Sequence, residues 1–136
     1  LYATYPLAQI ISNPILGTVS DLIGRKTILI LSYLGDATGY LLFALGLIEQ
    51  QVLLMFLGFF IAGLTGCNVA ASYAYIADAS VGERKARNYI FLNMLMGIAF
   101  IGGPLLAMQL TDPYYAFLGG SCITFFNALL LSLSLD

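Results

Sequence analysis

The chain has 136 residues, of which 60% are hydrophobic and only 9% are charged, with a mean hydropathy of +0.93. A water-soluble domain carries about 25% charged residues, so this composition excludes a soluble globule and indicates an integral membrane protein. The net charge of −2 includes only five basic residues, too few to form a nucleic-acid-binding surface.

Five apolar segments are each long enough to cross a bilayer, which takes about 20 residues as a helix. Because backbone polar groups in lipid must pair within their own segment, these segments predict helices and an all-α integral membrane fold. We expect the five spans, within a single membrane domain, at residues 1–19, 27–47, 52–77, 88–110 and 114–135.

The basic residues are confined to the first and third connections between these spans, and they are Arg25, Lys26, Arg84, Lys85 and Arg87. Since basic connections are retained in the cytoplasm, the pattern places both connections and the end of the last span on the cytoplasmic side. The first span then starts at the outer face. The chain also begins without Met, so we expect it to be a fragment that lacks a preceding helix.

The first span carries polar or small residues at every fourth position, at Gln9, Asn13, Gly17 and Asp21. Residues at this spacing share one face of a helix. A face turned to lipid would not contain Gln and Asn, and two interpretations stay open. The face either packs against another helix through side-chain hydrogen bonds, or it lines an aqueous path.

Asp36 falls near the middle of the second span. A carboxyl group at this depth costs a few kcal/mol to insert and indicates a functional site. Low-dielectric surroundings favour the protonated form of a carboxyl group, so Asp36 could load and release a proton during transport. The alternative role is a structural hydrogen bond to a neighbouring helix.

The third and fourth spans carry further polar or helix-bending positions. Small residues at four-residue spacing in the third span predict close helix packing, and Asn68 is the polar exception that could touch a ligand. In the fourth span, Pro104 after Gly102 and Gly103 removes a backbone hydrogen bond and predicts a bend. With no histidine, phosphate-binding loop or zinc-binding HExxH sequence, nothing indicates an enzyme, a cofactor or a metal site.

These residues resemble the major facilitator superfamily, and more narrowly its drug:proton antiporter branch, which includes the tetracycline efflux proteins. Residues 17–26, GTVSDLIGRK, are similar to the family's loop signature G-x-x-x-D-R-x-G-R-[RK], with Leu22 where the family has Arg. In the family, this loop contacts the adjacent helix end and the other half of the transporter. The resemblance therefore implies a cytoplasmic gate formed by Gly17, Asp21, Gly24, Arg25 and Lys26.

The resemblance extends over nearly the whole chain. Residues 61–66 and 74–78 look like one helix of the tetracycline exporters, and Phe59 takes the place of the family's Arg that is linked to proton coupling. The third connection, with Asp78, Glu83 and Arg87, is similar to the family's basic loop. Gly103 and Pro104 are similar to part of the antiporter motif G-x-x-x-G-P-x-x-G-G. The resemblance implies that they bend the helix and seal it against leak.

By this resemblance, the five spans are helices two to six of the family, part of its N-terminal six-helix bundle. The implied function is proton-coupled export of drugs or small amphipathic molecules across a bacterial inner membrane. The implied partners are the lipid bilayer, protons, the small-molecule substrate, a missing first helix and the second transporter half. The candidate residues of the proton or substrate path are Asp36, Gln9, Asn13 and Asn68. Two alternatives stay open: uptake of a sugar or other small metabolite, or a truncated membrane protein that does not transport.

Overall fold

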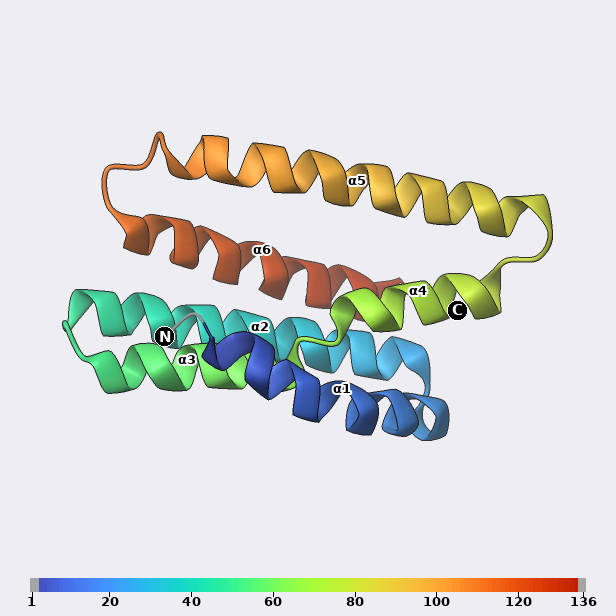
Figure 1. Cartoon of the computed structure of the whole chain (residues 1–136), viewed down its shortest axis with the longest axis horizontal. Helices are drawn as coiled ribbons and strands as arrows, with labels where there is room; N and C mark the ends of the chain where they lie inside the picture. Colours follow the sequence, from blue (N-terminus) through green and yellow to red (C-terminus); the bar gives the residue numbers. More distant parts are fainter. Residues whose placement is uncertain (1–2, 135–136) are drawn as a thin grey trace.

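The computed structural model describes residues 3–134, which form six helices and no strand (Figure 1). This confirms the all-α fold. In chain order the helices are α1 (Thr4–Ile23), α2 (Arg25–Ile48), α3 (Val52–Thr65), α4 (Asn68–Ala79), α5 (Glu83–Ala107) and α6 (Pro113–Leu133). The central helix is α2, which contacts α1, α3, α4 and α6, most extensively α3 and α6.

Within the described residues, four segments are long and apolar enough to cross a membrane, and they are Arg25–Ile48, Val52–Ala79, Glu83–Ala107 and Pro113–Leu133. Each exposes large hydrophobic side chains, which suits contact with lipid. Helix α1 is not among the four. The span expected at residues 1–19 begins in residues 1–2, which lie outside the described part of the chain, and it stays a prediction.

Helices α2 and α3 approach each other closely at two glycines. A Cβ atom added at Gly39 would lie 2.6 Å from the backbone oxygen of Gly58, and a Cβ atom added at Gly58 would lie 2.6 Å from the backbone oxygen of Gly39. Ala62 is fully buried in the same contact. Small residues let two helix backbones come this close, as the sequence predicts for residues of the third span.

We expect Gly39→Ala to destabilise the protein, because the added methyl group meets the backbone of α3 rather than a flexible side chain. Overpacking of this kind costs about 1–3 kcal/mol. Thermal unfolding in detergent, followed by circular dichroism, measures the loss. The matched control is Gly97→Ala on α5, where no described atom other than the adjoining helix backbone lies within 4 Å of the added Cβ. Equal shifts of the unfolding midpoint in both variants would contradict this packing.

The segment expected as one helix at residues 52–77 is divided in the structure. Helix α3 ends at Thr65 and α4 begins at Asn68, with Gly66 and Cys67 outside regular helix. Irregular backbone persists at membrane depth where the protein pairs its polar groups. Gln9 Nε2 donates a hydrogen bond to the carbonyl oxygen of Gly66, and the Cys67 backbone N–H donates to the carbonyl oxygen of Thr65 at 2.8 Å. The expectation of one uninterrupted helix is therefore corrected.

The third connection is also shorter than the sequence predicts. Helix α4 continues to Ala79 and α5 begins at Glu83, not near residue 88. Glu83 lies in the first turn of α5, where its negative charge complements the positive end of the helix dipole. Helix α5 runs along the outside of the bundle, and none of its residues is buried (Figure 1).

Candidate functional site

The polar loop expected to form a gate turns within one residue. Gly24 alone separates α1 from α2, and its φ of 95° lies in the left-handed region that glycine adopts without strain. This turn brings Arg25, the first residue of α2, back against the last turn of α1. There Arg25 Nη2 lies 2.9 Å from Asp21 Oδ1, and Arg25 Nη1 donates to Ser20 Oγ at 3.1 Å.

Arg25 and Lys26 also contact the ends of more distant helices. Arg25 Nε donates to Oδ2 of Asp78, in the last turns of α4, at 2.6 Å. Lys26 Nζ donates to the carbonyl oxygen of Ser134, directly after α6, at 2.5 Å. The C-terminal ends of α1, α4 and α6 and the start of α2 therefore meet at one end of the bundle, which we call the basic end (Figure 1).

The other residues expected at the gate or the bend are not joined to this cluster. Glu83 and Arg87 lie in the exposed first turns of α5, and no hydrogen bond or ion pair within residues 3–134 links them to Arg25. Gly103 and Pro104 lie in the last two turns of α5, which continues to Ala107. Apart from the adjoining backbone of α5, no described atom lies within 4 Å of a Cβ added at Gly103, so the expected bend and seal stay a prediction.

Asp36 is only 1% exposed and lies inside the bundle. Its Oδ2 accepts a hydrogen bond from Nδ2 of Asn68 at 2.8 Å. Its Oδ1 is buried and has no hydrogen-bond partner among the described residues. Because Asn68 is the first residue of α4, this bond joins α2 to the junction between α3 and α4. A buried polar atom left unpaired is rare in folded proteins, and a functional role would explain it.

The polar face of α1 divides into two parts. Its first part packs on the α3–α4 junction, because Gln9 donates to the Gly66 carbonyl oxygen and Ser12 Oγ donates to the Gly63 carbonyl oxygen at 3.2 Å. Its second part, with Asn13 and Gly17, lines a cavity of about 160 Å³. Gln9 therefore lies at a helix contact and Asn13 at a cavity, and the aqueous path stays a prediction.

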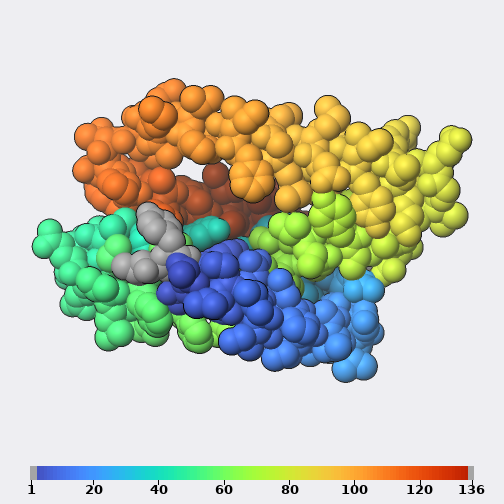
Figure 2. Space-filling view, viewed as in Figure 1, coloured from blue at the N-terminus to red at the C-terminus, as the bar shows by residue number. Residues whose placement is uncertain are grey.

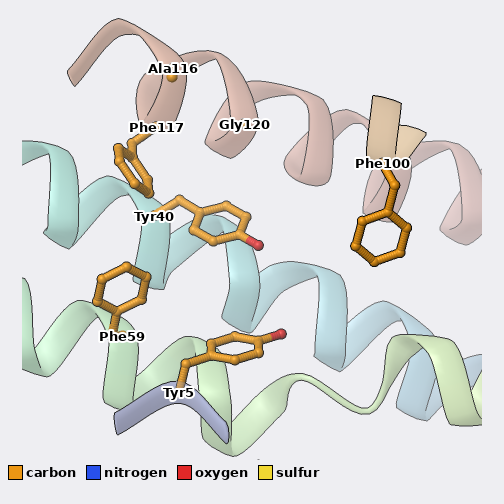
Figure 3. Close-up of a pocket in the computed structure, with 7 residues that line it drawn as sticks. All are labelled: Tyr5, Tyr40, Phe59, Phe100, Ala116, Phe117 and Gly120. Carbon is orange, nitrogen blue, oxygen red and sulfur yellow. The ribbon is translucent and has the colours of Figure 1, made fainter. Parts of the chain in front are cut away.

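A larger cavity of about 680 Å³ lies on the side of the bundle that faces α5. Its lining comes from five helices and is mostly aromatic: Tyr5, Tyr40, Phe59, Phe100, Ala116, Phe117 and Gly120. Figure 2 shows the hollow between α5 and the layer formed by α1 and α3. In Figure 3 the hydroxyl groups of Tyr5 and Tyr40 both point in the direction of Phe100.

This aromatic cavity could not be predicted from the sequence. The rings of Phe59 and Phe117 each pack against Phe43, at 4.3 Å between centroids, although the three residues lie on different helices. No spacing along the chain connects such residues. The nine Phe and nine Tyr residues are the only available signal, and their number says nothing about where they meet.

Comparison with known proteins agrees with this architecture. A model of the Major Facilitator Superfamily matches residues 1–136. The class C tetracycline resistance protein of Escherichia coli is 33% identical over 121 residues, covering 85% of this chain and 30% of that protein. The class H protein of Pasteurella multocida is 38% identical over 112 residues, covering 82% and 27%. The quinolone resistance protein NorA of Staphylococcus aureus is 28% identical over 110 residues, covering 76% and 26%.

No solved structure gives a significant match to the chain. The chain spans between 26% and 30% of the length of these three relatives. The family match, however, extends along all of its residues, and the helices have the length and composition of a multi-pass integral membrane protein. The chain belongs to the Major Facilitator Superfamily.

Proposed function

We propose that these 136 residues are part of a transporter that exports drugs or other small amphipathic molecules across a bacterial inner membrane, driven by protons. The observation that carries this proposal is the link between Asp36 and the basic end. Helix α4 is only 12 residues long, and it contacts Asp36 through Asn68 and Arg25 through Asp78. Relatives named for tetracycline and quinolone resistance support drugs as the substrates.

In this proposal, Asp36 carries the proton or binds a cationic substrate, and α4 transmits the change to the gate. Gly66 and Cys67 interrupt the helix. We propose that this interruption lets α4 move separately from α3. If Asp36 releases Asn68, the start of α4 is freed, and Asp78 at its other end can leave Arg25. Ion pairs that are easily broken suit this role.

The ion pairs of the basic end meet that requirement. The side chains of Asp21 and Asp78 are 62% and 59% exposed. Exposed ion pairs contribute only about 0–1 kcal/mol to stability. Breaking them would therefore cost little, and the fold would not depend on them.

We further propose that the aromatic cavity contributes to the substrate path. Its volume of about 680 Å³ lies within the range of small-molecule sites, which are lined mainly by apolar and aromatic side chains. Aromatic rings pack well against flat ring systems, and Tyr5 and Tyr40 add two hydroxyl groups. Uptake of a sugar has less support, since a sugar presents many hydroxyl groups that this lining would leave unpaired.

We expect Phe100→Ala to lower resistance to at least one aromatic drug, because it removes a ring from the cavity wall. Phe100 is 77% exposed on α5, so its loss leaves the fold intact. Phe91→Ala is the matched control, being 62% exposed on the same helix and not part of the lining. Minimum inhibitory concentrations, normalised to protein amount, measure the effect. Equal resistance in the two variants would remove the cavity from the substrate path.

The proposed function is tested by expressing the full-length protein in a bacterial strain that lacks its own efflux pumps. Minimum inhibitory concentrations for a panel that includes tetracyclines and quinolones should rise relative to the empty vector. No rise for any drug, with the protein present in the membrane, would contradict export. Uptake assays with labelled sugars would then test the alternative of import.

A further inference from the structure

The small cavity of about 160 Å³ lies between α1, α2 and α4, next to the basic end. Arg25 and Ser20 line it at that end, and Cys67 lines it at the α3–α4 junction. Its α4 wall consists of small residues, among them Ala70 and Ala74. The cavity therefore reaches from Arg25 at the basic end to the junction between α3 and α4.

Polar groups make this cavity suitable for water. Asn13 lines it, and Asn13 Oδ1 is buried without a hydrogen-bond partner among the described residues. Leaving such an oxygen unpaired costs about 1–3 kcal/mol, which a water molecule would recover. At roughly 30 Å³ for each water, the space accommodates on the order of five molecules. The Arg25 guanidinium and the Ser20 hydroxyl group supply further hydrogen-bond partners.

Polar side chains lead from Cys67, at the inner end of the cavity, toward Asp36. Cys67 Sγ lies 3.0 Å from Ser32 Oγ, and Ser32 is one helical turn from Asp36 on α2. Cys67 is also followed directly by Asn68, whose Nδ2 donates to Asp36 Oδ2. A thiol, a hydroxyl group and an amide thus lie between the cavity and the carboxyl group.

We propose that this cavity holds a file of water molecules that connects the solution at Arg25 with the Asn68–Asp36 pair. In an exporter driven by protons, the file gives the proton on Asp36 a path to the cytoplasm. That use rests on the proposed function, whereas the presence of water in the cavity does not. Asn13 and Cys67 are the residues that border this water.

Hydroxyl-radical labelling of the full-length protein by synchrotron radiolysis, read by mass spectrometry, tests the proposal. The radicals form from water itself, so side chains beside internal water are oxidised although they are closed to bulk solvent. Cys67 and Phe43 are matched in burial, at 4% and 5% exposed, and Phe43 packs among aromatic rings. After correction for intrinsic reactivity, Cys67 should be oxidised several-fold faster than Phe43. Equal protection of the two would overturn the proposal.

Two variants that fill the cavity make the test specific. Ala74→Leu and Ala70→Leu each extend a larger side chain from the α4 wall, and oxidation of Cys67 should then fall to the level of Phe43. Ala79→Leu, at an exposed position of the same helix, should leave it unchanged. Size-exclusion chromatography selects the variants that fold. If Cys67 is still oxidised in a folded Ala74→Leu or Ala70→Leu variant, the water beside it lies outside this cavity, and the proposal is overturned.

Transport assays on the same protein separate the two proposals. If the protein exports drugs but Cys67 is as protected from oxidation as Phe43, the proposed function stands and the water file is overturned. Oxidation of Cys67 in a protein that does not export would support the hydrated cavity and contradict the function to which we connect it.

Discussion

Asp36→Asn is expected to abolish drug resistance conferred by the full-length protein. Asparagine has the size of aspartate and can still accept the hydrogen bond from Asn68, but it cannot take up and release a proton. The minimum inhibitory concentration should fall to the level measured with the empty vector. Immunoblots of the membrane fraction confirm that the variant is present in equal amount.

The matched control is Asp112→Asn, which removes an exposed carboxyl group from the connection before α6. It should leave resistance unchanged, because Asp112 lies outside the bundle. Full resistance in Asp36→Asn would show that Asp36 serves the structure through its bond to Asn68 and has no part in coupling. Equal loss in both variants would indicate a general charge effect instead.

Arg25→Lys is expected to lower resistance nearly as much as Arg25→Gln. Lysine keeps the positive charge, but only the branched guanidinium can reach Asp21, Asp78 and Ser20 at once. Since the ion pairs are exposed, thermal stability in detergent should change by no more than about 1 kcal/mol. A large loss of resistance with a small loss of stability would identify Arg25 as part of the gate.

Arg84→Gln provides the control for Arg25, because Arg84 is an exposed basic residue in the first turn of α5 at the same end of the bundle. It should keep full resistance. If Arg25→Gln also retained full resistance, the ion-pair cluster would be a surface feature and the proposed gate would be wrong. If Arg25→Gln unfolded the protein, its role would be structural.

The grouping of the basic residues could be predicted because it depends on the order of charges along the chain. Hydropathy places the connections, and charge assigns their side. The charge pattern assigns these helix ends to one side of the membrane. The contacts of Arg25 with Asp78 and of Lys26 with Ser134 show that the helix ends do lie together. The one-residue turn at Gly24 differs from the expected spans, which end at residue 19 and resume at residue 27; glycine permits it because its φ of 95° lies in the left-handed region.

The interruption between α3 and α4 could not be predicted from the sequence of that segment. Gly66 and Cys67 lie in an apolar run that would continue as a helix if it were isolated in lipid. The freed carbonyl oxygen of Gly66 is paired by Gln9, which lies 57 positions earlier in the chain. The pairing of Asp36 with Asn68 depends on the same tertiary contact. Each of these residues could be recognised as polar from the sequence, but the residue that it pairs with could not be predicted.

Proton-driven export can be measured directly with inverted membrane vesicles that contain the full-length protein. Their outer surface corresponds to the cytoplasmic side, so an exporter accumulates radiolabelled tetracycline inside when respiration acidifies the vesicle interior. We predict accumulation that collapses on addition of an uncoupler and is absent with Asp36→Asn. Accumulation that an uncoupler leaves unchanged, or none above vesicles without the protein, would contradict the account.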